Sequence, residues 1–191
     1  MVLSDRTIKE ELAKGHIVIE PLGEGCVQPA SVDLHLDRKI LVFRNSRRPY
    51  IDVRQDMTDL MDMEEIGDDQ PFMLHPGEFV LASTLENIGV PDNLVARLEG
   101  KSSLGRIGLL IHSTAGYVDP GWKGHLTLEL SNVARLPVTL YYGMAIGQIS
   151  FLRLTAPAEN VYGSAKLKSK YQGQTQPTAS RFHQNFSKRN R

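Results

Sequence analysis

Two groups of reactive side chains lie close together within residues 99–130. The first is a polar turn with the sequence GKSSLGR, which contains Lys101, Ser102, Ser103 and Arg106. Two cations, two hydroxyls and the exposed N–H groups of a turn are suited to binding a polyphosphate. A serine pair that caps a helix in a surface turn is the alternative, and this segment on its own favours it.

The GKSS sequence fits neither of two known glycine motifs. A phosphate-binding P-loop requires glycine at position 95, where this chain has Val95, and no helix of useful length follows. A serine-hydrolase elbow has the pattern G-x-S-x-G, and the segment from Gly100 to Gly105 is one residue too long for it. We therefore exclude both motifs.

Glu129 is a lone carboxylate in the apolar run HLTLEL. Successive side chains of a strand alternate between two faces, so the leucines at 126, 128 and 130 share one face. Thr127 and Glu129 share the other. If that face lines a cleft, Glu129 is a partly buried carboxylate that can take up and return a proton in general acid–base catalysis. An exposed strand glutamate is the commoner alternative.

Other ionisable residues are weaker candidates. Asp33 lies on an expected strand and Asp119 just before a Pro-Gly turn, and each alone is more typical of an edge or turn residue than of a catalyst. His112 and His125 have no partners at metal-ligand spacing and are predicted to be structural. Cys26 is the only cysteine of the sequence, which excludes an internal disulfide and a zinc-dependent base deaminase.

The elements that position these residues are predicted to be mostly short strands. Residues 4–15 have the pattern of a helix that is capped at residue 4 or 5 and ended by Gly15. Strand-like segments separated by Pro and Gly follow at 16–20, 31–36, 39–43, 72–84, 94–100, 106–111, 125–132, 137–142 and 146–154. A helical turn is expected at residues 102–106. The chain is therefore predicted to be all-β with a few short helices, as a sandwich or barrel-like fold.

The strand pattern stops near Pro157, so we expect a β domain over residues 1–156 and a flexible tail over residues 157–191. The tail carries seven Lys or Arg and one Glu, whereas residues 52–69 carry eight Asp or Glu and one Arg. The acidic stretch is most simply a solvated loop or a short surface helix. The basic tail is either a solvated terminus or an arm that reaches an anion.

The composition is that of an ordinary globular protein of 191 residues, 41% of them hydrophobic and 23% charged. No apolar run is long enough to cross a membrane, and residues 1–15 lack the apolar core of a secretion signal. Together with the single Cys26, these features predict a cytoplasmic protein without a membrane partner. A barrel that binds single-stranded nucleic acid is a weak alternative, because aromatic residues make up only 7% of the chain.

Four short motifs occur in the order in which trimeric dUTPases have them: ASVDL, GKSS, GYVDPGWKG and GMAIGQI. The longer run RLEGKSSLGRIGLLIHSTAGYVDPGW, followed by LTLELSN, resembles more specifically the dCTP deaminases of that superfamily. The tail segment VYGSAKLKSKYQGQTQPTASR resembles their C-terminal segment, which closes over the nucleotide. The resemblance covers nearly the whole chain. It implies a β-clip or distorted jelly-roll fold, a homotrimer with active sites between subunits, and deamination without zinc.

The resemblance also implies roles for individual residues. Glu129 matches the general base and acid of the family, and Asp119 matches a residue at the sugar and base. Ser102 and Arg106 match groups that hold and polarise the water and the reacting base. The residues that match nucleotide contacts are Lys101, Ser102, Ser103, Leu104, Gly105, Arg106, Asp119, Thr127, Leu128, Glu129, Gln148, Tyr162, Lys170 and Gln174. Mg²⁺ is expected to arrive on the triphosphate, without a dedicated protein site.

Gly116 and Tyr117 resemble the branch of the family that also cleaves dUTP, although Phe or Trp is the usual aromatic there. The single-activity branch typically has a bulky residue, often His, after the TA of this motif. A glycine removes that bulk and could admit a water near the α-phosphate. The resemblance therefore favours a bifunctional enzyme that converts dCTP to dUMP, ammonia and diphosphate via dUTP. The alternatives are a deaminase that releases dUTP, a dUTPase, and a non-catalytic nucleotide-binding regulator.

Overall fold

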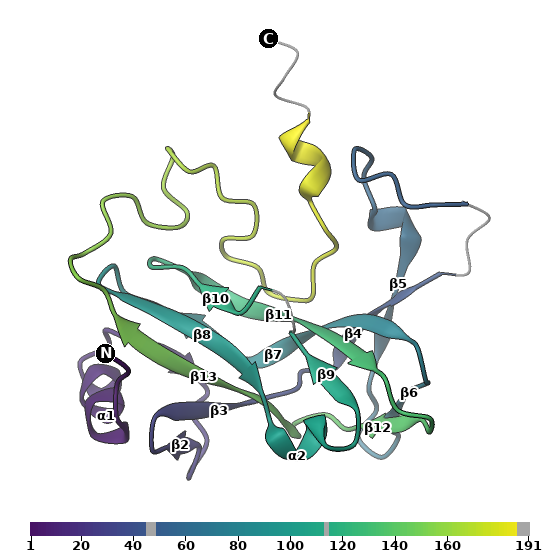
Figure 1. Ribbon diagram of the computed structural model, residues 1–191, viewed down its shortest axis with the longest axis horizontal. Helices are drawn as coiled ribbons and strands as arrows, with labels where there is room; N and C mark the ends of the chain where they lie inside the picture. The colour runs from purple at the N-terminus through teal and green to yellow at the C-terminus, as the bar shows by residue number, and fades with distance from the viewer. Residues whose placement is uncertain (45–48, 113–114, 187–191) are drawn as a thin grey trace.

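The computed structural model describes residues 1–44, 49–112 and 115–186, and strands dominate these residues (Figure 1). Helix α1 (Asp5–Ala13) precedes the first strand, as the sequence predicts. Ser4 is its N-cap, and Ile8 on its inner face is completely buried. Gly15 follows the helix with a φ of 69°, a left-handed conformation that glycine adopts without strain.

Antiparallel strands form two main sheets in the described part of the chain. The first has the order β5-β4-β7-β11-β9, and β1 also pairs with β7. Its strands are β1 (Val18–Glu20), β4 (Lys39–Phe43), β5 (Met61–Glu65), β7 (Phe79–Gly89), β9 (Leu109–Ile111) and β11 (Lys123–Asn132). The second, of order β10-β8-β13-β3-β2, comprises β2 (Val27–Gln28), β3 (Ser31–His35), β8 (Leu94–Gly100), β10 (Tyr117–Val118) and β13 (Ala145–Arg153). A small third sheet pairs β6 (Phe72–Leu74) with β12 (Val138–Leu140).

Both main sheets contribute side chains to one hydrophobic core. Leu128 and Leu130 of β11 and Ile149 and Phe151 of β13 are all completely buried in it. Between the two leucines, Glu129 is only half-buried. The alternation predicted for HLTLELSN is therefore confirmed, and it turns the side chain at position 129 away from the core.

Strands β7 and β11 shift register between His125 and Thr127. The shift leaves the β7 residues 84–86 opposite Leu126 alone. The completely buried Thr84 fills this gap, because its hydroxyl accepts a hydrogen bond from the Leu126 N–H at 2.9 Å and donates one to the Glu86 carbonyl at 2.8 Å. The bulge thus keeps buried backbone groups paired immediately before the outward-facing Thr127.

The prediction for the acidic residues 52–69 is wrong in part. Thr58–Leu60 forms the short 3-10 helix η1, in keeping with a surface helix, but Met61–Glu65 is strand β5 at the edge of the first sheet. Met61 is buried and the next four residues are exposed. All five residues of this acidic strand pair with β4, and Met61 packs in a small apolar cluster with Met57 and Leu60.

The helical turn predicted at residues 102–106 is confirmed as α2 (Ser102–Gly105), which directly follows β8. The described tail residues 157–186 form no strand; they pass above β10 and β11 and end in the 3-10 helix η2 (Phe182–Asn185) (Figure 1). The domain boundary near Pro157 and the flexibility of the tail stay predictions. No helix among the described residues is long and apolar enough to span a membrane.

Candidate active site

A pocket of about 400 Å³ lies on the outward face of β11. The half-buried side chains of Thr127 and Glu129 line it, because strand alternation turns both away from the core. The Leu128 side chain is completely buried in the core between them. A contact from Leu128 to a ligand in this pocket would therefore come from its backbone. We call this the Glu129 pocket.

Tyr162 of the tail forms one wall of the Glu129 pocket. Its ring packs against Trp122 with ring centroids 5.3 Å apart, and its hydroxyl accepts a hydrogen bond from the Tyr171 N–H at 3.2 Å. The pKa of Tyr162 is raised above its ordinary value, mainly because the phenol is removed from water. The phenol is therefore neutral across the physiological pH range.

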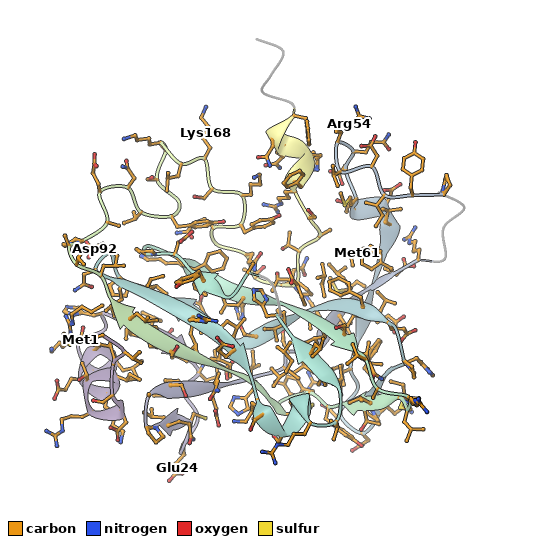
Figure 2. The ribbon with its side chains drawn as sticks, in the orientation of Figure 1. Met1, Glu24, Arg54, Met61, Asp92 and Lys168 are labelled. Atoms are coloured by element: carbon orange, nitrogen blue, oxygen red, sulfur yellow. The ribbon has the colours of Figure 1, made fainter. Side chains whose placement is uncertain are left out.

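Gln174 ties the tail to the strand that carries Glu129. Its Nε2 donates to the His125 carbonyl at 2.7 Å and to Thr127 Oγ1 at 3.0 Å. The backbone N–H of Thr178 also points to Thr127 Oγ1, at 3.4 Å. Thr127 is thus held by the tail on the same strand face as Glu129. Lys170 does not line the pocket, and Lys168 is exposed and points away from the sheets (Figure 2).

Asp119 and Tyr117 lie at the rim of the Glu129 pocket, and both are exposed. The carbonyl of Asp119 accepts a hydrogen bond from the Trp122 N–H at 3.1 Å, which closes the Pro-Gly turn. Gly116 is outside the lining. Its carbonyl accepts a hydrogen bond from the Leu98 N–H at 2.7 Å, and a Cβ at this position would lie 3.0 Å from the Leu98 carbonyl oxygen. A side chain at 116 would therefore press on β8 rather than enter the pocket.

The polar turn after β8 lies in a second pocket, of about 410 Å³. Lys101, Ser102, Ser103 and Gly105 line it, together with Gln148 from β13. We call it the turn pocket. Leu104 packs against the core instead, and the exposed Arg106 lies outside the lining of both pockets.

Asp33 lines neither pocket, but it contacts Lys101 of the turn pocket. Its Oδ1 is 2.7 Å from Lys101 Nζ, and the two side chains are 16% and 25% exposed. Asp33 pairs with Gln148 across β3 and β13, and the Gln148 Oε1 accepts a hydrogen bond from the Ser31 hydroxyl at 3.2 Å. The ion pair thus fixes the ammonium group of Lys101 against the second sheet.

The two pockets have no lining residue in common. In Figure 1 the helix α2 and the tail lie at opposite ends of the molecule. The carboxylates Asp119 and Glu129 line the first pocket, and no Lys or Arg in the described ranges joins them there. One chain therefore does not bring the carboxylate and the cationic turn together.

Several lining residues were not singled out from the sequence. Trp122 packs against the tail and Tyr171 belongs to it. Phe43, Met57, Met61, Phe79 and Leu81 form an apolar side of the Glu129 pocket. Leu81 lies directly opposite Glu129 across β7 and β11. The alternation in FVLAST indicates that positions 79 and 81 share a face. The alternation does not indicate which strand pairs with this one, so it does not indicate which pocket the two residues line.

A family model establishes what kind of chain this is. The model described as dCTP deaminase-like matches residues 2–154, which include the cationic turn, Asp119 and Glu129. The chain belongs to the dCTP deaminase-like family. The match ends close to Pro157, where the tail is predicted to begin.

Two curated members of the family extend the match through the tail. The dUMP-forming dCTP deaminase of Mycolicibacterium smegmatis is 58% identical over 188 residues, which cover 98% of this chain and 100% of that relative. The dUMP-forming dCTP deaminase of Nocardia farcinica is 59% identical over 186 residues, 97% of this chain and 94% of the relative. The likeness thus includes both pockets and the tail.

A solved structure of a dCTP deaminase has the same fold. The 2′-deoxycytidine 5′-triphosphate deaminase of Agrobacterium tumefaciens matches with a TM-score of 0.63 at 26% identity. The match covers 78% of this chain and 47% of that chain, so this chain spans about half the length of the Agrobacterium one. The expected all-β fold class is confirmed.

Proposed function

We propose that this protein is a bifunctional dCTP deaminase, which hydrolyses dCTP to dUMP, ammonia and diphosphate. The observation that carries the proposal is the half-buried Glu129, which lines a pocket that has residues of the tail on one side. The chain is also 58% identical over 188 residues to a relative named for this activity. The pocket, of about 400 Å³, is in the size range of small-molecule sites.

In the deamination step, Glu129 takes a proton from a water molecule, and the resulting hydroxide attacks C4 of the cytosine. Glu129 then delivers that proton to N3. The carboxylate then takes the proton of the new C4 hydroxyl and passes it to the amino group. The C4–N bond breaks, ammonia leaves with the bonding electron pair, and the C4 carbonyl forms. Thr127 and the backbone of Leu128 hold the edge of the pyrimidine. The product is dUTP, and one carboxylate performs both proton transfers.

The phosphates require cations that the Glu129 pocket does not supply from its described lining. Lys101 and the two serines of the turn pocket are suited to phosphate oxygens. We propose a homotrimer in which the turn of one subunit completes the Glu129 pocket of the next. Ser102 and Arg106 then reach the reacting water and the base from the neighbouring subunit, and Lys170 and Gln174 of the tail close over the nucleotide.

Magnesium is proposed to enter with the substrate. In the described ranges no three His, Cys, Asp or Glu side chains form a group that could hold a metal ion. Mg²⁺ binds readily to substrate phosphates while keeping several waters, so this chain needs no cage of its own. When bound there, the ion would neutralise part of the charge of the triphosphate.

The second step is hydrolysis of dUTP at the α-phosphate. A water attacks the α-phosphorus, and the bond from that phosphorus to the bridging oxygen breaks, so diphosphate leaves. Asp119 at the pocket rim is the proposed group that orients this water. The segment Gly116-Tyr117 shapes the rim through its contact with Leu98 of β8. We place both reactions in the cytoplasm, in keeping with the free and buried Cys26.

One incubation tests the reaction. The protein is mixed with dCTP and Mg²⁺, and ammonia, dUTP, dUMP and diphosphate are followed over time. The proposal requires equal final amounts of ammonia, dUMP and diphosphate. Equal amounts of dUTP and ammonia without dUMP would identify a single-activity deaminase. In a second incubation with dUTP in place of dCTP, dUMP formation by a protein that releases no ammonia from dCTP would identify a dUTPase. Tight binding of dCTP without any product would identify a regulator.

Mixing subunits tests the shared site. Ser102→Ala and Glu129→Gln variants are each expected to be inactive alone, and they are unfolded and refolded together. In a closed ring with random assembly, about one quarter of the sites then combine an intact turn with an intact carboxylate. Recovery of activity to roughly that fraction supports sites between subunits. No recovery, with mixed trimers demonstrated by mass spectrometry, would mean that each site is built within one chain.

A further inference from the structure

The segment of residues 120–125, PGWKGH, supports the tail on both sides of Trp122. We call it the docking segment. Its backbone hydrogen bonds to the tail are Tyr162 N–H to the Pro120 carbonyl at 2.7 Å, Gly173 N–H to the Lys123 carbonyl at 2.8 Å, and His125 N–H to the Gln174 carbonyl at 3.0 Å. The amide of Gln172 adds a bond to the Gly121 carbonyl at 2.9 Å. The tail is thus attached to the docking segment at two places, around residues 161–162 and around residues 172–174.

A glycine lies beneath the first attachment. Gly121 has a φ of 87°, and a Cβ built on it would lie 2.6 Å from Val161 Cβ and 3.0 Å from the Tyr162 carbonyl oxygen. Real Cβ atoms do not approach another carbon to 2.6 Å, because the repulsion is steep at this distance, and 3.0 Å to the oxygen is a tight contact. A side chain at 121 would therefore push Val161 and Tyr162 off the docking segment.

A second glycine lies beneath the other attachment. Gly124 has a φ of 139°, and a Cβ there would lie 2.9 Å from the Gln174 carbonyl oxygen and 3.1 Å from the Gln174 nitrogen. Both atoms belong to the tail backbone, which cannot rotate away as a side chain can. Any larger residue at 124 would displace the tail at Gln174.

We infer that Gly121 and Gly124 are positioning residues, which leave the space in which the tail lies close enough to complete the Glu129 pocket. Tyr162 and Gln174, the two tail residues directly above them, both line that pocket. Trp122 lies between the two glycines and packs against Tyr162. This inference rests on the proposed function only in taking the pocket as the nucleotide site.

The contact with the tail distinguishes these glycines from others with a positive φ. Gly143 has a φ of 72°, and a Cβ there would meet no atom within 4 Å. An alanine at 143 therefore introduces backbone strain like that at Gly121, whose φ is 87°, without touching the tail. Gly143→Ala is the matched control for Gly121→Ala; for Gly124→Ala, whose φ is 139°, it controls for a positive φ alone.

The test uses the full chain and two measurements. Hydrogen exchange reports how well the amides of Tyr162, Gly173 and Gln174 are protected without nucleotide, and steady-state kinetics give KM and kcat for dCTP with Mg²⁺. In Gly121→Ala and in Gly124→Ala we expect the tail amides to lose protection from exchange, while the amides of β13 keep it. KM for dCTP should rise about tenfold, which corresponds to closure of the tail over the nucleotide that is about 1.4 kcal/mol less favourable. The change in kcat should be smaller.

The control should leave tail protection and KM at the wild-type values. The inference is overturned if the tail amides of Gly124→Ala are as well protected as those of the wild type, or if Gly143→Ala loosens the tail equally.

A second variant tests the contact at Gly121. Removing the Val161 side chain in G121A/V161G should restore part of the protection that is lost in G121A. A double variant that protects the tail no better than G121A contradicts the contact argument. A wild-type protein that does not turn over dCTP would refute the proposed function, and the exchange comparison would still decide the inference.

Discussion

The Trp122 ring and the Tyr162 ring pack together across 40 positions of sequence, with their centroids 5.3 Å apart. Trp122 is the only tryptophan of the chain. Its fluorescence therefore reports on a contact between the β domain and the tail. Because both side chains line the Glu129 pocket, the same signal follows the closure of that pocket.

The first prediction concerns alkaline pH. Burial raises the pKa of Tyr162 above its ordinary value of 10.0, so the docked tail favours the neutral phenol. The contribution of Tyr162 to docking is therefore fully present below pH 10 and is lost as the pH rises through the raised pKa. We expect Trp122 fluorescence to change in that range in the wild type. The change should be absent in Tyr162→Phe and retained in a variant of the exposed Tyr50. An identical transition in Tyr162→Phe would assign it to another group.

The second prediction tests the proton transfers. Glu129→Gln keeps the size of the side chain and removes the titrating group, so ammonia release from dCTP should fall by about 10²–10⁴-fold. The binding of dCTP, measured by calorimetry, should change little. Glu64→Gln, an exposed glutamate on strand β5, is the control and should be fully active. Deamination by Glu129→Gln near the wild-type rate would show that another residue moves the protons.

The third prediction concerns the dUTPase step. A Cβ at position 116 would lie 3.0 Å from the Leu98 carbonyl, so Gly116→Ala should shift the rim that carries Tyr117 and Asp119. We expect dUMP formation to fall more than ammonia formation, and dUTP to accumulate. The dUTP:dUMP ratio during dCTP turnover measures this. Equal loss of both products would mean that the rim serves the two steps alike.

The fourth prediction concerns the bulge in the sheet. Thr84→Val removes the hydroxyl that pairs with the Leu126 N–H and the Glu86 carbonyl, and leaves both groups buried. Urea unfolding should show a loss of about 1–3 kcal/mol in the free energy of unfolding. Thr84→Ser keeps the hydroxyl and should retain most of that stability. A Val variant as stable as the Ser variant would mean that the Leu126 N–H has found another partner.

The local pattern of the sequence accounts for much of the fold. The alternation in HLTLELSN predicts that Leu128 is buried and Glu129 is not, because side-chain direction in a strand is decided within two residues. The end of α1 just before Gly15 and the turn α2 follow from residues adjacent to them in the same way. The roles expected of Ser102 and Arg106 are implied only by a resemblance in motif order, since their own spacing favours a simple surface turn.

Long-range pairing decided the rest. Nothing within the acidic stretch predicts strand β5, because that strand depends on an edge offered by β4. The ion pair of Lys101 with Asp33 and the packing of Trp122 on Tyr162 join segments 68 and 40 positions apart. Only the tertiary structure separates the cationic turn from Glu129 into two pockets. Periodicity carries information about neighbours along the chain, whereas these contacts depend on which strands meet and in which register.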